Sequence, residues 1–325
     1  MQVTLLLPAM RRLGGQRLSV ASARWLGRGA LAGPLEPGRQ AQLRRQFQLH
    51  PGHWAVAALT RLDDRGDAAG NTWLRADPCH VRPDLNGARL LATDDGLALA
   101  QADADALLPA LAPLFADVGW HIDAGSPGRW YLRLPPATAL PDFMEPDDAL
   151  GTDLIDHLIE GPQGRQWRAL LSEAQVVLHN HPWNEARAHA GKLPINSLWF
   201  WGGGRLPERV EAACHAFHSN DEVALALAAA AGVAAILPER FVPSKHNQAF
   251  DLVAVRDLAR LEADWLVPAF DALREGRLQQ LCLDGEDGVS RVLRRGDRWR
   301  IWRRAAGGPV ASGAGAGSAG AKRRP

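Results

Sequence analysis

Residues 176–204 read VVLHNHPWNEARAHAGKLPINSLWFWGGG, and this stretch governs how the rest of the chain is interpreted. An apolar run at 176–178 is followed by a polar, helix-like segment at 184–190. A second apolar run, 195–201, stops at three consecutive glycines, 202–204. An apolar run, a short helix and another apolar run are the pattern of a βαβ unit with buried parallel strands. The glycines permit close approach of a backbone or a ligand, because they carry no side chain.

The same stretch resembles the archaeal-type cofactor-independent phosphoglycerate mutases, and more closely a bacterial branch of RpfE-type regulatory proteins. The family pattern is His-Pro-x-Asn, then Arg, then Gly-Lys-x-Pro-x-Asn, then an apolar strand that ends in Trp-Gly-x-Gly. The resemblance is specific here, because its spacing holds across residues 181–204, and it is looser elsewhere. The matching residues are His181, Pro182, Asn184, Arg187, Gly191, Lys192, Pro194, Asn196, Trp199, Trp201, Gly202 and Gly204.

The resemblance implies an α/β fold of the alkaline-phosphatase type, with a mostly parallel sheet flanked by helices. Residues 1–71 and 136–304 are expected to form this core domain. Residues 72–135 read as a small inserted α+β module, and the Gly- and Ala-rich residues 305–325 as a disordered tail. Short apolar runs between helical segments predict one mostly parallel sheet, with strands near Val3, Val176, Leu198, Ala216, Leu252 and Leu281.

Composition limits the classes of partner. The formal net charge of +1 gives no strong field for nucleic acid or an anionic membrane, so neither is expected as a partner. The opening apolar run is too short for a signal peptide or a membrane span. Cys79, Cys214 and Cys282 are widely spaced and form no CxxC pair, which fits a reducing compartment. A cytoplasmic protein is therefore predicted.

The chemistry that the resemblance implies needs two divalent metals and a hydroxyl nucleophile between them. In the family, the first strand ends in an aspartate ligand, but here it runs into Pro8-Ala9. The turn that carries the nucleophile corresponds to 51–54, Pro-Gly-His-Trp, which has no hydroxyl. No histidine follows His246, although the family takes its last ligands from there. We therefore expect no cofactor and a lost metal centre; manganese or zinc would be present only if the protein is an active enzyme.

Other residues leave alternatives open. His179 and His181 would share a strand face and could hold zinc if His215, His218 or His246 joined them, or they could simply line a strand end. Asp284, Glu286 and Asp287 could bind a cation or form a solvated turn. Arg187 and Lys192 could bind an anion or be surface charge.

The function predicted from these observations is that of a phosphoglycerate-mutase-like protein without catalysis, acting in regulation or ligand sensing. The alternatives are an active metal-dependent mutase or phosphotransferase with a rearranged site, and a protein-interaction scaffold. A phosphorylated or carboxylated small molecule would suit the positive charges near the central strands. The candidate ligand-binding residues are His179, His181, Asn184, Arg187, Lys192, Asn196, Gly202, Gly203 and Gly204.

Overall fold

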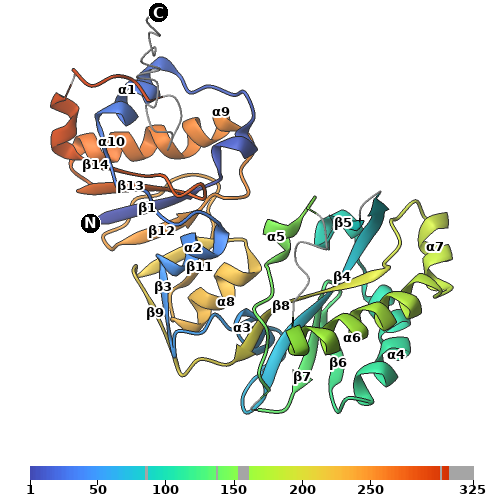
Figure 1. Ribbon diagram of the computed structural model, residues 1–325. Helices are drawn as coiled ribbons and strands as arrows, with labels where there is room; N and C mark the ends of the chain where they lie inside the picture. The colour runs from blue at the N-terminus through green and yellow to red at the C-terminus, as the bar shows by residue number, and fades with distance from the viewer. Residues whose placement is uncertain (85–86, 137, 153–160, 301, 307–325) are drawn as a thin grey trace, which may run out of the picture. The chain divides into compact units, whose positions relative to one another are not determined.

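The computed structural model describes residues 1–84, 87–136, 138–152, 161–300 and 302–306 (Figure 1). The chain forms two compact units. Unit 1 comprises Met1–Gln48 and Glu211–Pro325, and unit 2 comprises Leu49–Val210. Unit 2 is therefore wider than the expected module at 72–135, because it also takes in the helices and the strand that flank that module.

Unit 1 is built on a seven-stranded, mostly parallel sheet, which confirms the predicted α/β class. The first five strands in spatial order are parallel to their neighbours, and the last two are antiparallel. The apolar run that starts the chain forms the central strand, as predicted. The order is β11 (Ala234–Ile236), β10 (Ala216–Ser219), β12 (Gln248–Asp251), β1 (Gln2–Leu7), β13 (Gln280–Gly285), β14 (Ser290–Arg294) and β2 (Ala30–Leu31).

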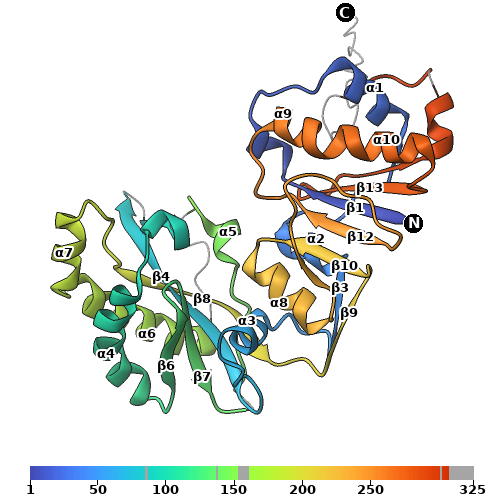
Figure 2. The ribbon, with the colours of Figure 1, turned by 180° about the vertical axis from the view of Figure 1, so that it is seen from behind.

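Helices cover both faces of this sheet: α1, α9 and α10 lie on one face, and α2 and α8 on the other (Figures 1 and 2). Val3, Leu5 and Leu7 of β1 are fully buried in the core beneath α9 and α10. The helices of unit 1 are η1 (Met10–Leu13), α1 (Val20–Arg28), α2 (Arg39–Arg44), α8 (Glu222–Ala230), α9 (Leu258–Leu261), the π-helix η4 (Glu262–Leu266), α10 (Val267–Glu275) and η5 (Arg295–Trp299).

Unit 2 is built on a five-stranded sheet whose strands all pair antiparallel. Its longest strand, β4, runs straight through Pro78. The strands are β4 (Thr72–Asp84), β5 (Gly87–Ala92), β6 (His121–Ser126), β7 (Arg129–Leu134) and β8 (Ser197–Arg205). A separate pair is formed by β3 (Phe47–His50) and β9 (Arg209–Ala212).

The faces of the unit 2 sheet follow the alternation of β4. Leu74 and Ala76 lie in the core that also contains buried residues of α4 and α6, whereas Trp73 lies in a separate cluster with alanines of α3. This alternation is the two-residue period of a strand. The helices of unit 2 are α3 (Val56–Arg65), η2 (Asp94–Leu97), α4 (Gln101–Ala116), α5 (Pro146–Ala149), α6 (Gly161–His179) and α7 (Trp183–His189).

The predicted βαβ unit at 176–204 is wrong. Its first apolar run is the last turn of α6, in which Val176 is 62% exposed. Leu170, Ala174 and Leu178 are buried at four-residue spacing, which is the period of a helix. The second run is β8, which pairs antiparallel with β4 in unit 2 and not with β1. Val176 and Leu198 therefore do not share the sheet of Val3.

The end of the chain also differs from the prediction. The 3-10 helix η5 spans 295–299, where Asp297 accepts the backbone N–H of Arg294. Ala306 falls in the predicted tail, yet it is buried against the core of unit 1, and its N–H donates to Ala23. Residues 307–325 lie outside the described part of the chain. Among the described helices, none has the length and apolar character to cross a bilayer.

Candidate functional site

The predicted ligand residue Arg187 is turned into the protein. It is 3% exposed on α7, and its Nη1 lies 2.8 Å from the Asp103 carboxylate. Its Nε and Nη2 donate to the carbonyls of Leu193 and Leu97 at 2.9 and 2.6 Å. Burial alone would raise the pKa of Asp103, but hydrogen bonds from Trp183 and Arg187 lower it. Arg187 therefore ties α7 to the start of α4 and to η2.

The neighbouring polar residues hold the chain between α6 and β8. Asn184 donates to the carbonyls of Leu178 and Ile195 and accepts the N–H of Ile195. His181 accepts the N–H of Trp183 through Nδ1, which caps the first turn of α7. All of these hydrogen bonds are formed with other groups of the same protein.

Three further members of the predicted set lie apart from one another. Asn196 bonds both the N–H and the carbonyl of Val81 in β4, and Lys192 donates to the carbonyl of Ala98. His179 is exposed at the end of α6. His179 and His181 therefore occupy a helix end and a loop, not one face of a strand, so their predicted pairing is wrong.

The three glycines of β8 allow a close approach by the loop before α3. Gly204 has φ +154°, and a Cβ there would lie 2.5 Å from Cδ2 of His53. The Gly203 carbonyl lies 2.7 Å from Nε2 of His53; since a carbonyl only accepts, this nitrogen carries the proton. A Cβ at Gly202 would lie 3.1 Å from Val56 of α3. The glycines therefore position His53 against β8.

A cavity of about 470 Å³ opens beside these glycines. Arg205 and Glu208, which are both exposed, bring opposite charges to it. No side-chain partner of either is found among the described residues. Of the predicted residues, Gly204 alone lines this cavity. The lining comprises Pro51, His53, Thr72, Pro136, Thr138, Leu140, Gly204, Arg205, Leu206 and Glu208.

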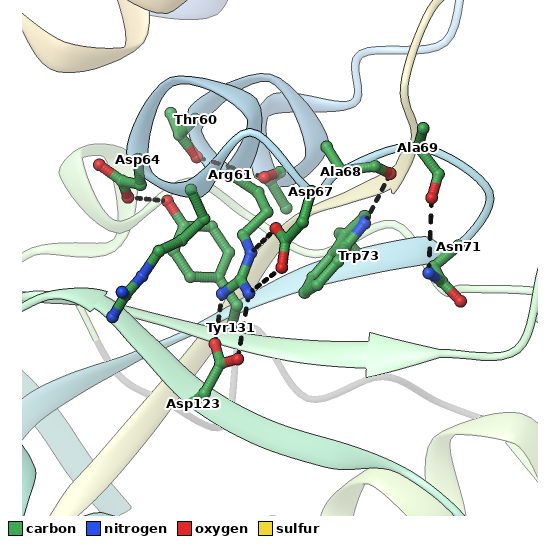
Figure 3. Close-up of polar contacts among 12 residues, drawn as sticks. Thr60, Arg61, Asp64, Asp67, Ala68, Ala69, Asn71, Trp73, Asp123 and Tyr131 are labelled. Atoms are coloured by element: carbon green, nitrogen blue, oxygen red, sulfur yellow. Dashed lines mark hydrogen bonds and ion pairs between the residues drawn. The ribbon is translucent and has the colours of Figure 1, made fainter.

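A buried ionic network anchors α3, the helix that follows the His53 loop (Figure 3). Arg61 of α3 is 4% exposed and forms ion pairs with Asp67 and with Asp123 of β6. Its guanidinium carbon lies 4.4 Å from the ring centroid of Trp73, a cation–π contact. The raised pKa of Arg61 reflects the two carboxylates, which outweigh the effect of burial.

A second contact fixes the other side of the same helix: the Tyr131 hydroxyl donates to Asp64 at 2.6 Å (Figure 3). Both contacts join α3 to the sheet of unit 2, and so fix the helix that follows the His53 loop.

Unit 1 places a second polar group at the carboxyl edge of its parallel strands, where open α/β sheets bind ligands. Asp251, which ends β12, is 5% exposed. Arg39 of α2 meets both of its oxygens, at 3.1 and 2.5 Å. Ser219, at the end of β10, donates to the same carboxylate at 2.7 Å, and Asp221 lies 3.3 Å from Arg39. The pKa of Arg39 is raised, because these carboxylates outweigh burial, which alone would lower it.

Strand β13 carries a similar ion pair near its carboxyl end. Arg45 contacts both oxygens of Asp284, at 2.9 and 2.7 Å. Gln42 lies between the two arginines in sequence and donates to the carbonyls of Leu7 and Asp284. Burial raises the pKa of Asp284, and Arg45 offsets part of that effect. Arg39 of α2 and Arg45, which directly follows this helix, thus present two guanidinium groups to the carboxyl edge of three adjacent strands.

The turn after β13 is buried as well. Glu286, 4% exposed, accepts the N–H of Ala9 and pairs with Arg12 at 3.0 Å. Asp287 accepts the N–H of Met10 at 3.4 Å. The expectation of a solvated turn is therefore wrong for Asp284 and Glu286, since arginines and backbone N–H groups hold both carboxylates inside the protein.

This edge does not fit the two-metal centre of the resemblance. Such a centre requires carboxylates and imidazoles with free lone pairs. Asp251 and Asp284 each direct both oxygens at an arginine. Within the residues that the structure describes, no group of three or more His, Cys, Asp or Glu side chains is arranged to hold a metal ion.

The histidines considered as further zinc ligands have other neighbours, and all three lie in unit 1. The rings of His215 and His246 are tilted against each other with centroids 5.5 Å apart, and His218 stacks on Phe250. His218 also contacts the carbonyl of Ile236 through Nδ1.

Sequence reasoning missed Arg39, Arg45 and Asp251 at the edge, and Arg205 and Glu208 at the cavity. One signal was present: Asp251 is the last residue of the strand Gln248–Asp251, which places an acid at the carboxyl end of a strand. Its partner Arg39 lies 212 positions away, so no local pattern joins them.

Comparison with known proteins finds similarity to one group. Over 64 residues, 20% of this chain, the sequence is 39% identical to a probable 2,3-bisphosphoglycerate-independent phosphoglycerate mutase of Geobacter sulfurreducens. Over 63 residues it is 40% identical to the corresponding mutase of Methanosarcina acetivorans. Each alignment spans only 16% of the relative's length. No protein-family profile matches the sequence.

Two solved structures align along most of the chain. A cofactor-independent phosphoglycerate mutase from Thermoplasma acidophilum covers 91% of this chain, and 90% of its own length is covered, with 14% identity and a TM-score of 0.40. The PH0037 protein of Pyrococcus horikoshii covers 94%, with 90% of its own length covered, 12% identity and a TM-score of 0.48. The chain is thus similar in sequence to phosphoglycerate mutases over about a fifth of its length.

Proposed function

We propose that this is a phosphoglycerate-mutase-like protein of the RpfE type that does not use two-metal catalysis. Its role in this proposal is regulatory, and it works by binding a phosphorylated or carboxylated small molecule. The observation that carries the proposal is that Arg39 and Arg45 form ion pairs with Asp251 and Asp284, the acids at the carboxyl edge of unit 1. Two metal ions would have to displace two arginines that are already hydrogen-bonded to both oxygens of each acid.

The energetics of these ion pairs favour keeping each carboxylate bound to its arginine. A buried carboxylate that loses its partner costs about 3–5 kcal/mol, whereas a paired one is tolerated. Arg39 and Asp251 are both under 10% exposed, so the pair is shielded from water. A fixed guanidinium supplies the positive charge that a metal ion would otherwise bring, but it offers no open coordination position for a phosphoryl oxygen.

The cavity of unit 2 is the ligand site in this proposal. Arg205 supplies an exposed guanidinium suited to a bidentate contact with phosphate or carboxylate. His53 donates through Nε2 to the carbonyl of Gly203, so its Nδ1 can accept a hydrogen bond from a hydroxyl group of a ligand. Glu208 on the same rim selects against ligands of high negative charge. A small monoanion with hydroxyl groups fits this combination.

The proposal is tested by thermal shift of the full chain against a panel of small phosphorylated and carboxylated metabolites. At least one should raise the melting temperature of the wild type, and Arg205→Ala should abolish that rise while leaving the melting temperature of the free protein unchanged. Arg165→Ala is the matched control, because Arg165 is an exposed arginine of α6 that does not line the cavity. If no compound of the panel raises the melting temperature of the wild type, the ligand-sensing role is refuted.

An active mutase is the second candidate, and the 39–40% identity to mutases over 63–64 residues favours it. Equilibrium dialysis against Mn²⁺, together with an assay for interconversion of 3- and 2-phosphoglycerate, separates the two. The regulatory proposal expects no tight Mn²⁺ binding and no turnover. Two bound ions per chain with turnover would establish the enzyme and refute the proposal.

A further inference from the structure

The segment from the end of η5 onward exposes two tryptophans to solvent. Trp299 is 69% exposed and Trp302 is 75% exposed, the most exposed aromatic side chains described. Neither indole N–H has a hydrogen-bond partner among the described residues. The guanidinium carbon of Arg298 lies 4.9 Å from the centroid of the Trp299 ring, yet both indoles remain mostly exposed. Burying a tryptophan is strongly favourable, so two largely exposed indoles in one short segment point to a partner that covers them.

The segment is held against α1 of the same unit by backbone contacts. Arg28 donates to the carbonyl of Arg298 at 3.1 Å, and Arg303 donates to the carbonyl of Gly29 at 3.0 Å. The N–H of Ala306 donates to Ala23 at 2.8 Å. A Cβ on Gly27 would lie 2.0 Å from the carbonyl oxygen of Arg304, so only glycine admits this approach. The segment therefore runs back along α1, from its last residue towards its first turn.

This arrangement concentrates positive charge. Asp297 is the acid paired within the segment, to Arg300 at 3.0 Å. Arg24 and Arg304 are exposed and engage no acid among the described residues. Burial, and then the nearby charge of Arg303, lower the pKa of Arg291 beneath the segment. We call the group the basic tryptophan surface; it consists of Arg24, Arg28, Arg298, Trp299, Arg300, Trp302, Arg303 and Arg304.

We propose that the basic tryptophan surface binds the face of an anionic phospholipid bilayer. Arginines and tryptophans are the pair of residue types that sit at a membrane interface: the guanidinium groups meet lipid phosphates, and the indoles lie at the boundary of headgroups and acyl chains. The chain's net charge of +1 hides this surface, because acids elsewhere balance its arginines.

A bilayer fits better than a nucleic acid for a reason of shape and polarity. Nucleic acids stack their bases on aromatic platforms and gain nothing from exposed aliphatic groups. Here Val20, one turn from Ala23 on α1, is 66% exposed, which adds apolar area beside the arginines. The indoles also extend from a short 3-10 turn and the residues after it, not from a sheet or a groove. Reversible membrane attachment requires both signals, apolar side chains and basic charge.

The test is co-sedimentation of the full chain with vesicles of phosphatidylcholine alone and with 30% phosphatidylserine, at physiological salt. We expect binding only with phosphatidylserine. Arg24→Gln/Arg304→Gln should weaken it roughly 30-fold, from the usual contribution of each basic residue near such a surface. Trp299→Ser/Trp302→Ser should weaken it as well, without changing the circular dichroism spectrum or the melting temperature.

The control is Arg240→Gln/Lys245→Gln, which removes the same charge from exposed residues of the loop between β11 and β12. It should bind vesicles like the wild type. Equal loss in the control would reduce the effect to net charge and overturn the proposal. Absence of vesicle binding in the wild type, or tighter binding to a single-stranded oligonucleotide than to vesicles, would also overturn it.

Discussion

Arg39→Met tests the closure of the carboxyl edge of unit 1. The substitution keeps most of the volume of the side chain but removes both hydrogen bonds to Asp251, which is 5% exposed. The Ser219 hydroxyl remains as a partner. Breaking a buried pair on one side costs about 3–5 kcal/mol. For a domain of this size we expect the melting temperature to fall by roughly 6–20 °C.

The measurement is urea unfolding followed by circular dichroism, with Asp251→Leu and the double variant completing a cycle. The double variant should be more stable than Arg39→Met, because no buried charge is then left unpaired. Arg274→Met is the matched control: Arg274 pairs with Asp271 on the surface, where loss of a pair costs only a few tenths of a kcal/mol.

The size of the stability deficit of Arg39→Met relative to the wild type is the decisive quantity. A deficit below about 1 kcal/mol at pH 7, or additive effects in the cycle, would show that the pair does not hold this edge closed.

Three further perturbations have defined outcomes. Arg187→Ala should lower the free energy of unfolding by about 3–5 kcal/mol at neutral pH. Because the pKa of Asp103 is lowered in the folded protein, the pair stabilises the protein above the ordinary aspartate pKa, and the loss should fade as pH drops through the lowered pKa. A loss that is independent of pH in urea titrations would contradict this. Gly204→Ala should cost about 1–3 kcal/mol by displacing His53, and an unchanged unfolding midpoint would show that the ring moves freely. A chain ending at residue 304 should be about 1 kcal/mol less stable than one ending at Ala306, because it lacks the hydrogen bond from the Ala306 N–H to the carbonyl of Ala23. Equal melting temperatures would show that Ala306 does not pack against unit 1.

The sequence was sufficient for elements whose patterns are local. Val3, Leu5 and Leu7 indicate a buried strand, because they belong to a short, mostly apolar run at the start of the chain. The apolar face of α4 and the alternation around the turn of the β6–β7 hairpin are likewise local patterns. In each case the residues that decide the structure lie within one short window.

The errors arose where a decision depended on distant residues. The three apolar residues 176–178 fit a strand or the end of a helix equally well, and the period of α6 decides between them only when Trp167 is included. β8 was correctly read as a strand, but its partner is β4, more than 100 positions earlier, and local sequence does not specify that pairing. The motif residues were taken as ligand contacts because they are polar; Arg187 and Asn184 instead satisfy buried backbone groups.

The distribution of charge partners supports the proposed binding role over catalysis. A phosphoryl-transfer site holds carboxylates whose lone pairs are open to metal ions. At the carboxyl edge of unit 1, Arg39 and Arg45 instead contact both oxygens of Asp251 and of Asp284. The exposed charges without side-chain partners in the described part of the chain include Arg205 at the cavity of unit 2, and Arg24 and Arg304 on the basic tryptophan surface of unit 1. Because a charge gains most from a new partner where it has none, our proposals place ligands at these two sites and not at the edge of the parallel sheet.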